Sequence, residues 1–175
     1  MTMPNNNNSR ILLKRLKKTL SELGEAQARL NKIVKIIADS MNSEVCSIYL
    51  INRHNILELY ATEGLRSKAV HYSQLNVGQG LVGKIAATAE PIKTSHASKT
   101  KGFRYLPETG EEIYNSFLGV PIQRLGKMLG VLVIQNLKNR EFTDDDVYGL
   151  EIVAMVIAEM AELGAFTSSD GSDEL

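Results

Sequence analysis

Three glycines in the segment 78–83 have the spacing of a nucleotide-binding turn. Gly78, Gly80 and Gly83 reproduce the pattern GxGxxG, in which glycines let the backbone approach a pyrophosphate at the start of a helix. A dinucleotide site also needs an acidic residue about 20 positions further on, which holds the ribose. Residues 98–104 read Ser-Lys-Thr-Lys-Gly-Phe-Arg and contain no acid. The glycines therefore predict a tight turn into a helix rather than a dinucleotide site.

Side chains that perform catalysis or bind metals are few in this sequence. The single cysteine, Cys46, permits neither an internal disulfide nor a site of several thiolates. His54, His71 and His96 fall in predicted turns or connections and lack the paired spacing of metal ligands. We expect Cys46 to be buried and inert, and each histidine to be an ordinary loop residue. No catalytic residue, metal or cofactor is predicted for this chain.

The composition is that of one soluble domain. The chain has 175 residues, 43% of them hydrophobic and 23% charged, which is enough for a real core. Twenty basic and twenty acidic residues cancel, which argues against nucleic acid or an anionic membrane as a partner. The basic residues clustered within 10–18 are interpreted as the solvated face of a helix. With one thiol and no apolar run of signal-peptide or membrane-spanning length, the expected location is the cytoplasm.

The two ends differ in composition from the rest of the chain. Residues 1–12 include a run of four asparagines and are predicted to be disordered. Residues 164–175 are polar, acidic and rich in Gly and Ser, as linkers are. We therefore expect 164–175 to lead into the C-terminal region of a longer protein.

Hydrophobic residues at alternating spacings of three and four predict one long helix over 13–41. The pattern is sustained over four heptads by Leu13, Leu16, Leu20, Leu23, Leu30, Val34, Ile37 and Met41. Gln27 interrupts it at an a position, where a buried polar residue favours one register and one oligomeric state. We expect the N-terminal half to form a homodimer contact and the half from Leu30 onward to pack on its own domain. The alternative is an amphipathic helix that packs only on its own domain.

The middle of the chain is typical of antiparallel strands. Residues 44–51 and 56–62 are rich in β-forming side chains and are joined by a plausible turn. Residues 114–123 and 127–136 form a second predicted hairpin around a short turn that contains glycine. These segments are expected to be central strands of one sheet.

Two helices complete the predicted fold. Residues 81–89 form a short helix that Pro91 prevents from continuing. Thr143, followed by three aspartates, is an N-cap that opens a helix through Leu163. A helix, a hairpin, a short helix, a second hairpin and a final helix predict an α+β sandwich.

Strand alternation places several polar side chains on the face of the sheet opposite Cys46. We expect an apolar cleft with a few convergent polar groups there, which is the pattern of a small-molecule site. The loop 95–113 is long and contains Gly and Pro, and it is the predicted lid. The candidate ligand-binding residues are Ser47, Tyr49, Thr62, Leu81, Val82, Arg104, Tyr105, Tyr114, Ser116, Val133 and Gln135. The competing interpretation is that the serines and tyrosines merely cover a half-exposed sheet.

Seven short motifs, in this order along the chain, resemble those of GAF domains. They are Glu-Val-Cys-Ser-Ile-Tyr-Leu at 44–50, Ala-Thr-Glu-Gly-Leu at 61–65, the glycine segment 78–83, Ala-Glu-Pro-Ile at 89–92, Phe-Leu-Gly-Val-Pro-Ile at 117–122, Gly-Val-Leu-Val at 130–133 and Phe-Thr-Asp-Asp-Asp at 142–146. The resemblance covers residues 30–163. It implies a central antiparallel sheet of about six strands. It also implies that the N- and C-terminal helices lie on one face, and a ligand pocket with a short helix and a loop on the other.

Among GAF domains, the motifs are most similar to the N-terminal domain of the nitrogen-related phosphotransferase-system enzymes I, which are phosphoenolpyruvate-protein phosphotransferases. This resemblance implies a regulatory domain that binds glutamine, signals nitrogen status and controls autophosphorylation of the downstream enzyme. The phosphoacceptor histidine, the phosphoenolpyruvate-binding barrel and the Mg²⁺ carboxylates of that family would follow Leu175, as would contact with a phosphocarrier protein. The domain itself is therefore expected not to be an enzyme.

A glutamine ligand presents a carboxylate, an ammonium group and a side-chain amide. Arg104 is suited to bind the carboxylate with a bidentate contact, aided by backbone N–H groups at the start of the short helix. The open candidates for the ammonium are Glu63, Glu111 and Glu112, and those for the amide are Gln135 and Ser47.

Two other functions stay open within the same fold. Cyclic-nucleotide-binding GAF domains carry an Asn-Lys, Phe, Asp-Glu constellation, which this chain matches in part with Asn136, Lys138, Phe142 and Asp146, while Val147 stands where the final acid would be. A dimerisation module whose pocket has lost its ligand would account for the heptads equally well. GAF enzymes that reduce methionine sulfoxide use several pocket cysteines, and one thiol cannot run that cycle.

Overall fold

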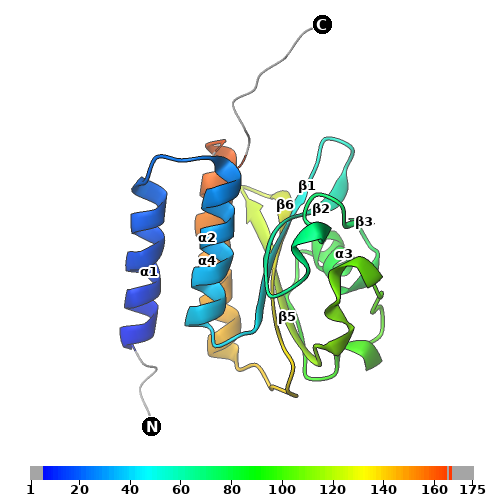
Figure 1. Ribbon diagram of the computed structural model, residues 1–175. Coiled ribbons are helices and arrows are strands. Elements are labelled where there is room, and N and C mark those ends of the chain that lie inside the picture. The colour runs from blue at the N-terminus through cyan, green and yellow to red at the C-terminus, as the bar shows by residue number, and fades with distance from the viewer. Residues whose placement is uncertain (1–5, 165, 167–175) are drawn as a thin grey trace, which may run out of the picture.

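The computed structural model describes residues 6–164 and residue 166 (Figure 1). The helices are α1 (Asn6–Ser21), α2 (Ala26–Ser40), α3 (Gly80–Thr88) and α4 (Asp144–Glu162). The strands are β1 (Val45–Ile51), β2 (Ile56–Glu63), β3 (Gln74–Asn76), β4 (Ile92–Thr94), β5 (Ser116–Arg124) and β6 (Lys127–Asn136). Four short 3₁₀ turns lie in the connections: η1 (Ser67–Ala69), η2 (Ala97–Lys99), η3 (Pro107–Thr109) and η4 (Glu111–Ile113).

Within the described residues the strands form one six-stranded sheet in the order β3-β2-β1-β6-β5-β4, and all neighbours are antiparallel. Helices α1, α2 and α4 stand on one side of this sheet, and α3 with the long loops lies on the other (Figure 1). The predicted α+β arrangement is therefore confirmed. It has three layers, so the central strands are covered on both faces.

The larger core lies between the sheet and the helices α2 and α4. Cys46, Ile48 and Leu50 of β1 belong to it, together with Ile37 of α2 and Leu150 of α4. Successive strand residues point to opposite faces, so these alternate positions all face the helices. The predicted orientation of Cys46 is confirmed.

A second, smaller core lies between the sheet and α3. Tyr49 of β1 and Val133 of β6 meet Leu81 and Ile85 of α3 there. Because the neighbouring strand residues face the other core, β1 is buried from Val45 to Leu50 without interruption. This second core forms the floor of the candidate site.

Helix α4 begins as its sequence predicts. The Thr143 hydroxyl accepts a hydrogen bond from the N–H of Asp146, and the Asp146 carboxylate accepts one from the N–H of Thr143. This reciprocal capping satisfies two N–H groups that a helix start otherwise leaves without partners. Three aspartates in the first turn also complement the positive end of the helix dipole.

The predicted single helix over 13–41 is wrong, because the chain breaks into α1 and α2 between Ser21 and Ala26. The two helices run in opposite directions side by side (Figure 1). The Arg29 guanidinium donates hydrogen bonds to the carbonyls of Glu22 and Gly24 at the break. The hydrophobic spacing continues across the break because each helix needs an apolar face of its own, so periodicity alone does not reveal the reversal.

Helix α1 buries part of its apolar face on its own domain. Leu12 and Leu16 are buried, whereas Leu13 is 47% exposed and Leu23 is fully exposed in the connection. Gln27 does not occupy a helix–helix contact. Its side-chain amide donates to the carbonyl of Tyr60 at 2.8 Å and so ties α2 to strand β2 of its own domain.

Both predicted terminal boundaries change in part. Residues 6–12 belong to α1, so the predicted disorder over 1–12 is wrong for them, because burial of Leu12 and Leu16 stabilises the helix. Residues 1–5 lie outside the described residues. Of the predicted linker 164–175, only Gly164 and Phe166 are described, and Phe166 is buried in the larger core.

Candidate functional site

A cavity opens on the α3 side of the sheet. It comprises about 360 Å³ including its open mouth, and its enclosed part has room for little more than one water molecule. Its lining is formed by Tyr49, Leu75, Gln79, Gly80, Leu81, Val82, Phe103, Arg104, Leu106, Glu111 and Phe117. Most of these side chains are apolar, and Arg104 and Glu111 are the charged ones. An apolar wall with a few polar groups is typical of small-molecule sites.

The glycine segment forms one edge of this cavity. Gly78 and Gly80 have φ angles of +95° and +65°, in the left-handed region that favours glycine. A Cβ on Gly83 would lie 2.6 Å from the carbonyl oxygen of Asn76, so only glycine lets α3 approach this closely. The predicted turn into a short helix is therefore confirmed. Gly80, Leu81 and Val82 line the cavity, and N–H groups in the first turn of a helix have no acceptor within it.

The loop 95–113, the predicted lid, is held at both ends. The N–H of Ala97 donates to the carbonyl of Asn115 at 2.7 Å near its start. Near its end, the Ser73 hydroxyl donates to the Glu108 carboxylate at 2.6 Å, and the N–H of Arg66 donates to the carbonyl of Thr109. The stretch 101–105 lies between these anchors and carries two cavity residues, so this shorter stretch is the part suited to act as a lid.

Two residues of this stretch close the cavity. Phe103 packs against the smaller core, and Arg104 crosses the start of α3. The Cβ of Arg104 lies 3.2 Å from the position that a Cβ on Gly80 would take. Gly80 therefore lets the stretch lie directly on the helix, and the arginine reaches the cavity mouth as a consequence.

Glu111 is the second charged residue of the cavity. Burial raises the pKa of its carboxyl group from 4.5 to about 7, although hydrogen bonds from the backbone of Leu106 and the side chain of Gln135 act in the opposite direction. The neighbouring carboxylates of Glu108 and Glu112 raise this pKa further. Burial also raises the pKa of Tyr49, with Glu111 as the next cause, so the Tyr49 hydroxyl stays neutral.

Four of the predicted ligand-binding residues line the cavity, namely Tyr49, Leu81, Val82 and Arg104. Two more support it from behind. Val133 belongs to the smaller core beneath it, and Gln135 hydrogen-bonds Glu111.

The other predicted residues do not line the cavity. The hydroxyl groups of Ser47 and Thr62 lie 2.9 Å apart and form a partly buried cross-strand pair. The Tyr114 hydroxyl donates to the carbonyl of Gly64, and Tyr105 is exposed and hydrogen-bonded to Glu112. These side chains are satisfied by the protein itself.

The predicted placement of Ser116 is wrong. Its hydroxyl donates to the carbonyl of Lys138 at 2.7 Å, and the next residue, Phe117, reaches the cavity instead. Phe117 pairs with Gln135 across the hairpin, whereas Ser116 pairs with Asn136. A shift of one residue exchanges the two faces of a strand. The prediction placed Tyr114 and Ser116 on the cavity face of β5, and this assignment is off by one residue.

Seven cavity residues were absent from the set of candidate ligand-binding residues: Leu75, Gln79, Gly80, Phe103, Leu106, Glu111 and Phe117. Of these, Glu111 was one of the open candidates for the ammonium group. Phe117 could have been found from the alternation of the strand, because Leu118 and Val120 face the helices and Phe117 does not share their face. Phe103 and Leu106 lie in an irregular loop, where no periodicity indicates which side chains turn inward.

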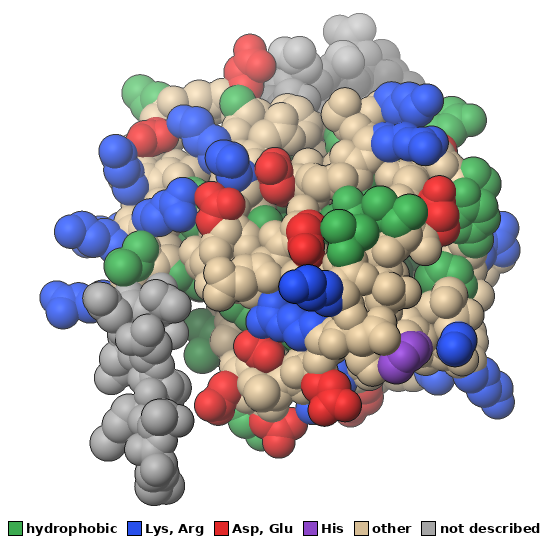
Figure 2. Space-filling view, turned by 60° about the horizontal axis from the view of Figure 1, so that its bottom comes forward, with side chains coloured by type: hydrophobic (Ala, Val, Ile, Leu, Met, Phe, Trp, Pro, Cys, Tyr) green, Lys and Arg blue, Asp and Glu red, His purple; other side chains and the backbone are tan. Residues whose placement is uncertain are grey.

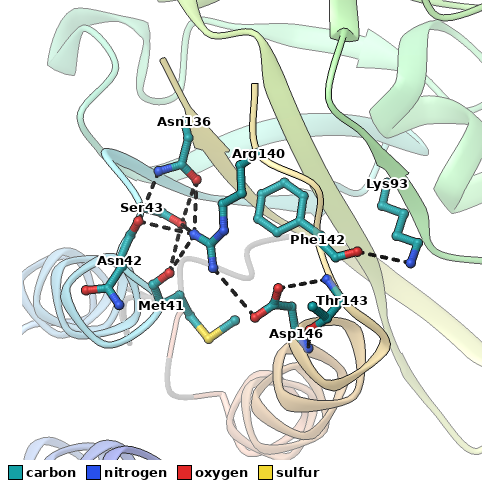
Figure 3. A network of polar contacts seen from close by, with 9 residues as sticks. All are labelled: Met41, Asn42, Ser43, Lys93, Asn136, Arg140, Phe142, Thr143 and Asp146. Atoms are coloured by element: carbon teal, nitrogen blue, oxygen red, sulfur yellow. Dashed lines mark hydrogen bonds and ion pairs between the residues drawn. The ribbon is translucent and has the colours of Figure 1, made fainter. Parts of the chain in front are cut away.

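Three of the residues that resemble a cyclic-nucleotide constellation, Asn136, Phe142 and Asp146, belong to a structural network (Figure 3), and none of the three lines the cavity. The Arg140 guanidinium donates to the carbonyl of Met41 at 2.8 Å and pairs with Asp146, and it lies 4.7 Å from the centre of the Phe142 ring. Asn136 donates to the carbonyl of Asn42. This network joins the ends of α2 and β6 to the start of α4. It therefore explains the presence of these residue types without a bound nucleotide.

Cys46 is buried, as its place on the strand predicts. Cys46 is fully buried, and its pKa is raised by burial and then by Glu63. The described part of the chain contains no group of three or more His, Cys, Asp or Glu side chains arranged to bind a metal ion. Among the described helices, none combines the length and the apolar character needed to cross a membrane.

Comparison with known proteins extends this description. The family model for the GAF domain matches residues 25–160. A protein of Escherichia coli K12 named "Phosphoenolpyruvate-dependent phosphotransferase system" is 32% identical over 165 residues, which cover 91% of this chain and 22% of that protein. A Nif-specific regulatory protein of Azospirillum lipoferum is 27% identical over 154 residues, which cover 83% of this chain and 24% of that protein.

A solved structure also shows similarity to a GAF domain. The GAF domain of a phosphoenolpyruvate-protein phosphotransferase from Coxiella burnetii superimposes with a TM-score of 0.84 at 29% identity, covering 92% of this chain and 96% of that one. The chain spans about a fifth of the length of the curated relatives above. The arrangement of sheet and helices agrees with the sequence match, and the chain therefore belongs to the GAF domain family.

Proposed function

We propose that this chain is the regulatory sensing domain of a phosphoenolpyruvate-protein phosphotransferase and that its cavity binds glutamine. The observation that carries the proposal is the lining of the cavity, where one cationic and one acidic side chain, Arg104 and Glu111, stand in an otherwise mostly apolar wall. A free amino acid carries the two complementary charges. The similarity to GAF domains of phosphotransferase-system proteins supports the parent enzyme.

The dimensions of the cavity favour a small ligand. Its total space of about 360 Å³ is at the lower end of the usual range for ligand pockets, and the enclosed part is narrow. Binding therefore requires the stretch 101–105 to move outward and close again. Arg104 would then hold the ligand carboxylate, with the N–H groups at the start of α3 beside it.

Closure of the cavity could transmit ligand binding to the downstream enzyme through the packing of the layers. Strands β1 and β6 carry cavity-side residues on one face and pack against α2 and α4 on the other. A ligand that binds one arrangement of these layers better than another shifts their populations, with a typical coupling of about 1–3 kcal/mol. In the full-length cytoplasmic protein, domains that follow this chain would bind phosphoenolpyruvate and Mg²⁺, and a phosphocarrier protein would receive the phosphoryl group.

Calorimetry with four ligands tests the proposal. Glutamine is expected to bind, whereas 2-oxoglutarate, which lacks the ammonium group, and the cyclic nucleotides cAMP and cGMP are expected not to. Arg104→Ala should weaken glutamine binding by roughly tenfold or more, as expected for loss of a charge-assisted hydrogen bond. The matched control is Lys101→Ala, which removes an exposed cation from the same loop. Binding of a cyclic nucleotide alone, or equal effects of the two substitutions, would contradict the proposal.

A homodimer is the second proposed property, and the surface of α1 and α4 favours it. A groove between these helices is lined by Leu13, Leu16, Leu20 and Val156, and Met155 beside it is 65% exposed. Helix α1 contains Lys and Arg but no acid, whereas α4 contains Asp and Glu but no Lys or Arg. Lys and Arg side chains project from the left of Figure 2, the side on which α1 lies in Figure 1.

These opposite charges let α1 of one copy lie along α4 of a second copy, so the proposed occupant of the groove is another copy of this chain. Sedimentation should show a dimer that Leu13→Asp dissociates. Leu125→Asp, at a turn residue that is 92% exposed, should leave the dimer intact. A protein that stays monomeric at high concentration would refute this contact, and a dimer that binds none of the four ligands would instead support the ligand-free dimerisation module.

A further inference from the structure

Glu111 lines the cavity, and no cation is among the groups that shift the pKa of its carboxyl group. The groups that influence its carboxylate, after burial itself, are the backbone of Leu106, the side chain of Gln135, and the carboxylates of Glu108 and Glu112. None of these groups, all of which belong to described residues, is a cation. An ionised carboxylate in such a place is costly, because burial removes water and the neighbouring acids add repulsion.

We propose that Glu111 carries a proton in the empty cavity and gives it up to solvent when the primary ammonium group of a ligand binds. This inference rests on the proposed amino-acid-binding function and assigns the ammonium to one carboxylate. The O–H bond of the carboxylic acid breaks, the proton passes to a buffer base, and the carboxylate forms an ion pair with the ammonium. No oxidant, reductant or co-reactant is needed.

The geometry selects Glu111 among the three acids that the sequence leaves open. Glu111 lines the cavity, whereas Glu63 at the end of β2 does not. Glu112 is exposed and hydrogen-bonds Tyr105 at the surface. Of these three acids, only Glu111 therefore combines access to the ligand with partial burial.

Other titratable or charged groups lie near Glu111. Tyr49 of β1 stays neutral because its pKa is raised, and Arg104 of the loop lines the same cavity. Glu108 and Glu112 flank Glu111 in the chain, and Gln135 of β6 does not titrate. No histidine lies in the described lining. The variants Glu111→Gln and Glu112→Gln therefore identify the group that exchanges a proton on binding.

The size of the effect follows from the pKa of Glu111, which is about 7. At pH 7 about half of the empty cavities carry the proton, so binding should release about half a proton per site. Between pH 8 and pH 6 the apparent affinity should fall by about tenfold, because binding must then displace the proton from most sites.

Titration calorimetry of glutamine into the whole chain at pH 7 measures this release directly. The binding enthalpy should differ between phosphate and Tris buffers, because Tris takes up a proton with a larger enthalpy, and the difference gives the number of protons. Glu112→Gln, the matched control, should keep both the buffer difference and the tenfold pH effect. Glu111→Gln should bind more weakly, with no buffer difference and no pH effect between 6 and 8.

The outcomes separate this inference from the proposed function. Absence of any binding heat from glutamine in either buffer would overturn the proposed function and this inference with it. Binding with the same enthalpy in both buffers would overturn the proton release alone. A ¹³C NMR titration of the Glu111 carboxyl carbon in the empty protein gives a second measurement, and a midpoint near pH 4.5 would refute the protonated state.

Discussion

Replacing Glu111 with glutamine is expected to stabilise the protein increasingly as the pH rises. The pKa of Glu111 is raised by burial from 4.5 to about 7 in the folded protein. Between these values the folded state holds a proton that the unfolded chain has lost, so the free energy of unfolding falls as the pH rises through this window. Below it the proton is bound in both states, and above it the full penalty is present.

The magnitude follows from the same shift. A displacement of about 2.5 pH units at 1.36 kcal/mol each corresponds to about 3 kcal/mol at alkaline pH, and residual contact with solvent reduces this to about 2–3 kcal/mol. Glutamine has the shape of a protonated glutamate and can accept the same hydrogen bonds from Leu106 and Gln135, but it does not ionise. The variant therefore avoids the penalty without leaving a cavity.

Urea denaturation of the two proteins in steps from pH 5 to pH 8 measures this difference. The gap in unfolding free energy between Glu111→Gln and the parent should widen by about 2 kcal/mol over this range. Glu112→Gln should run parallel to the parent, because Glu112 is exposed. A constant gap for Glu111→Gln across the range would refute the reasoning that burial keeps this carboxyl group protonated.

Three further predictions concern the framework. Arg140→Ala should lower the unfolding free energy by about 2 kcal/mol in denaturant titrations, because it leaves the carbonyl of Met41 and the Asp146 carboxylate without their charged donor. The control, Arg124→Ala, removes an exposed ion pair and should lower the unfolding free energy by less than about 1 kcal/mol. Gly83→Ala should lower the unfolding free energy by at least about 1–3 kcal/mol, because the new Cβ would lie 2.6 Å from the Asn76 carbonyl oxygen. Gly149→Ala, at an open position inside α4, should instead raise the unfolding free energy by about 0.5–1 kcal/mol. Thermal melts that rank the two variants the other way would contradict this prediction. Cys46 should react with a thiol reagent only as fast as the protein unfolds, because its thiol is buried and its pKa is raised, and fast labelling of the folded protein would show otherwise.

Local sequence determined much of this protein. The cap at Thr143 depends on two residues three positions apart, and the turn at Gly78 and Gly80 depends on backbone angles that glycine adopts freely. Alternation along β1 placed Cys46 and Tyr49 on opposite faces. Each of these features follows from interactions among residues close together in the chain, so the sequence was sufficient to predict them.

Tertiary structure decided the features that depend on distant segments. The reversal between α1 and α2 leaves the hydrophobic period unchanged, and only packing on one domain distinguishes it from a continuous helix. The pairing of Phe117 with Gln135 decides which side chain of β5 reaches the cavity, because a shift of one residue exchanges the two faces. The pKa of Glu111 depends on how the loop covers the sheet, since the loss of water around a carboxyl group results from the folded surroundings and not from its neighbours in the sequence alone.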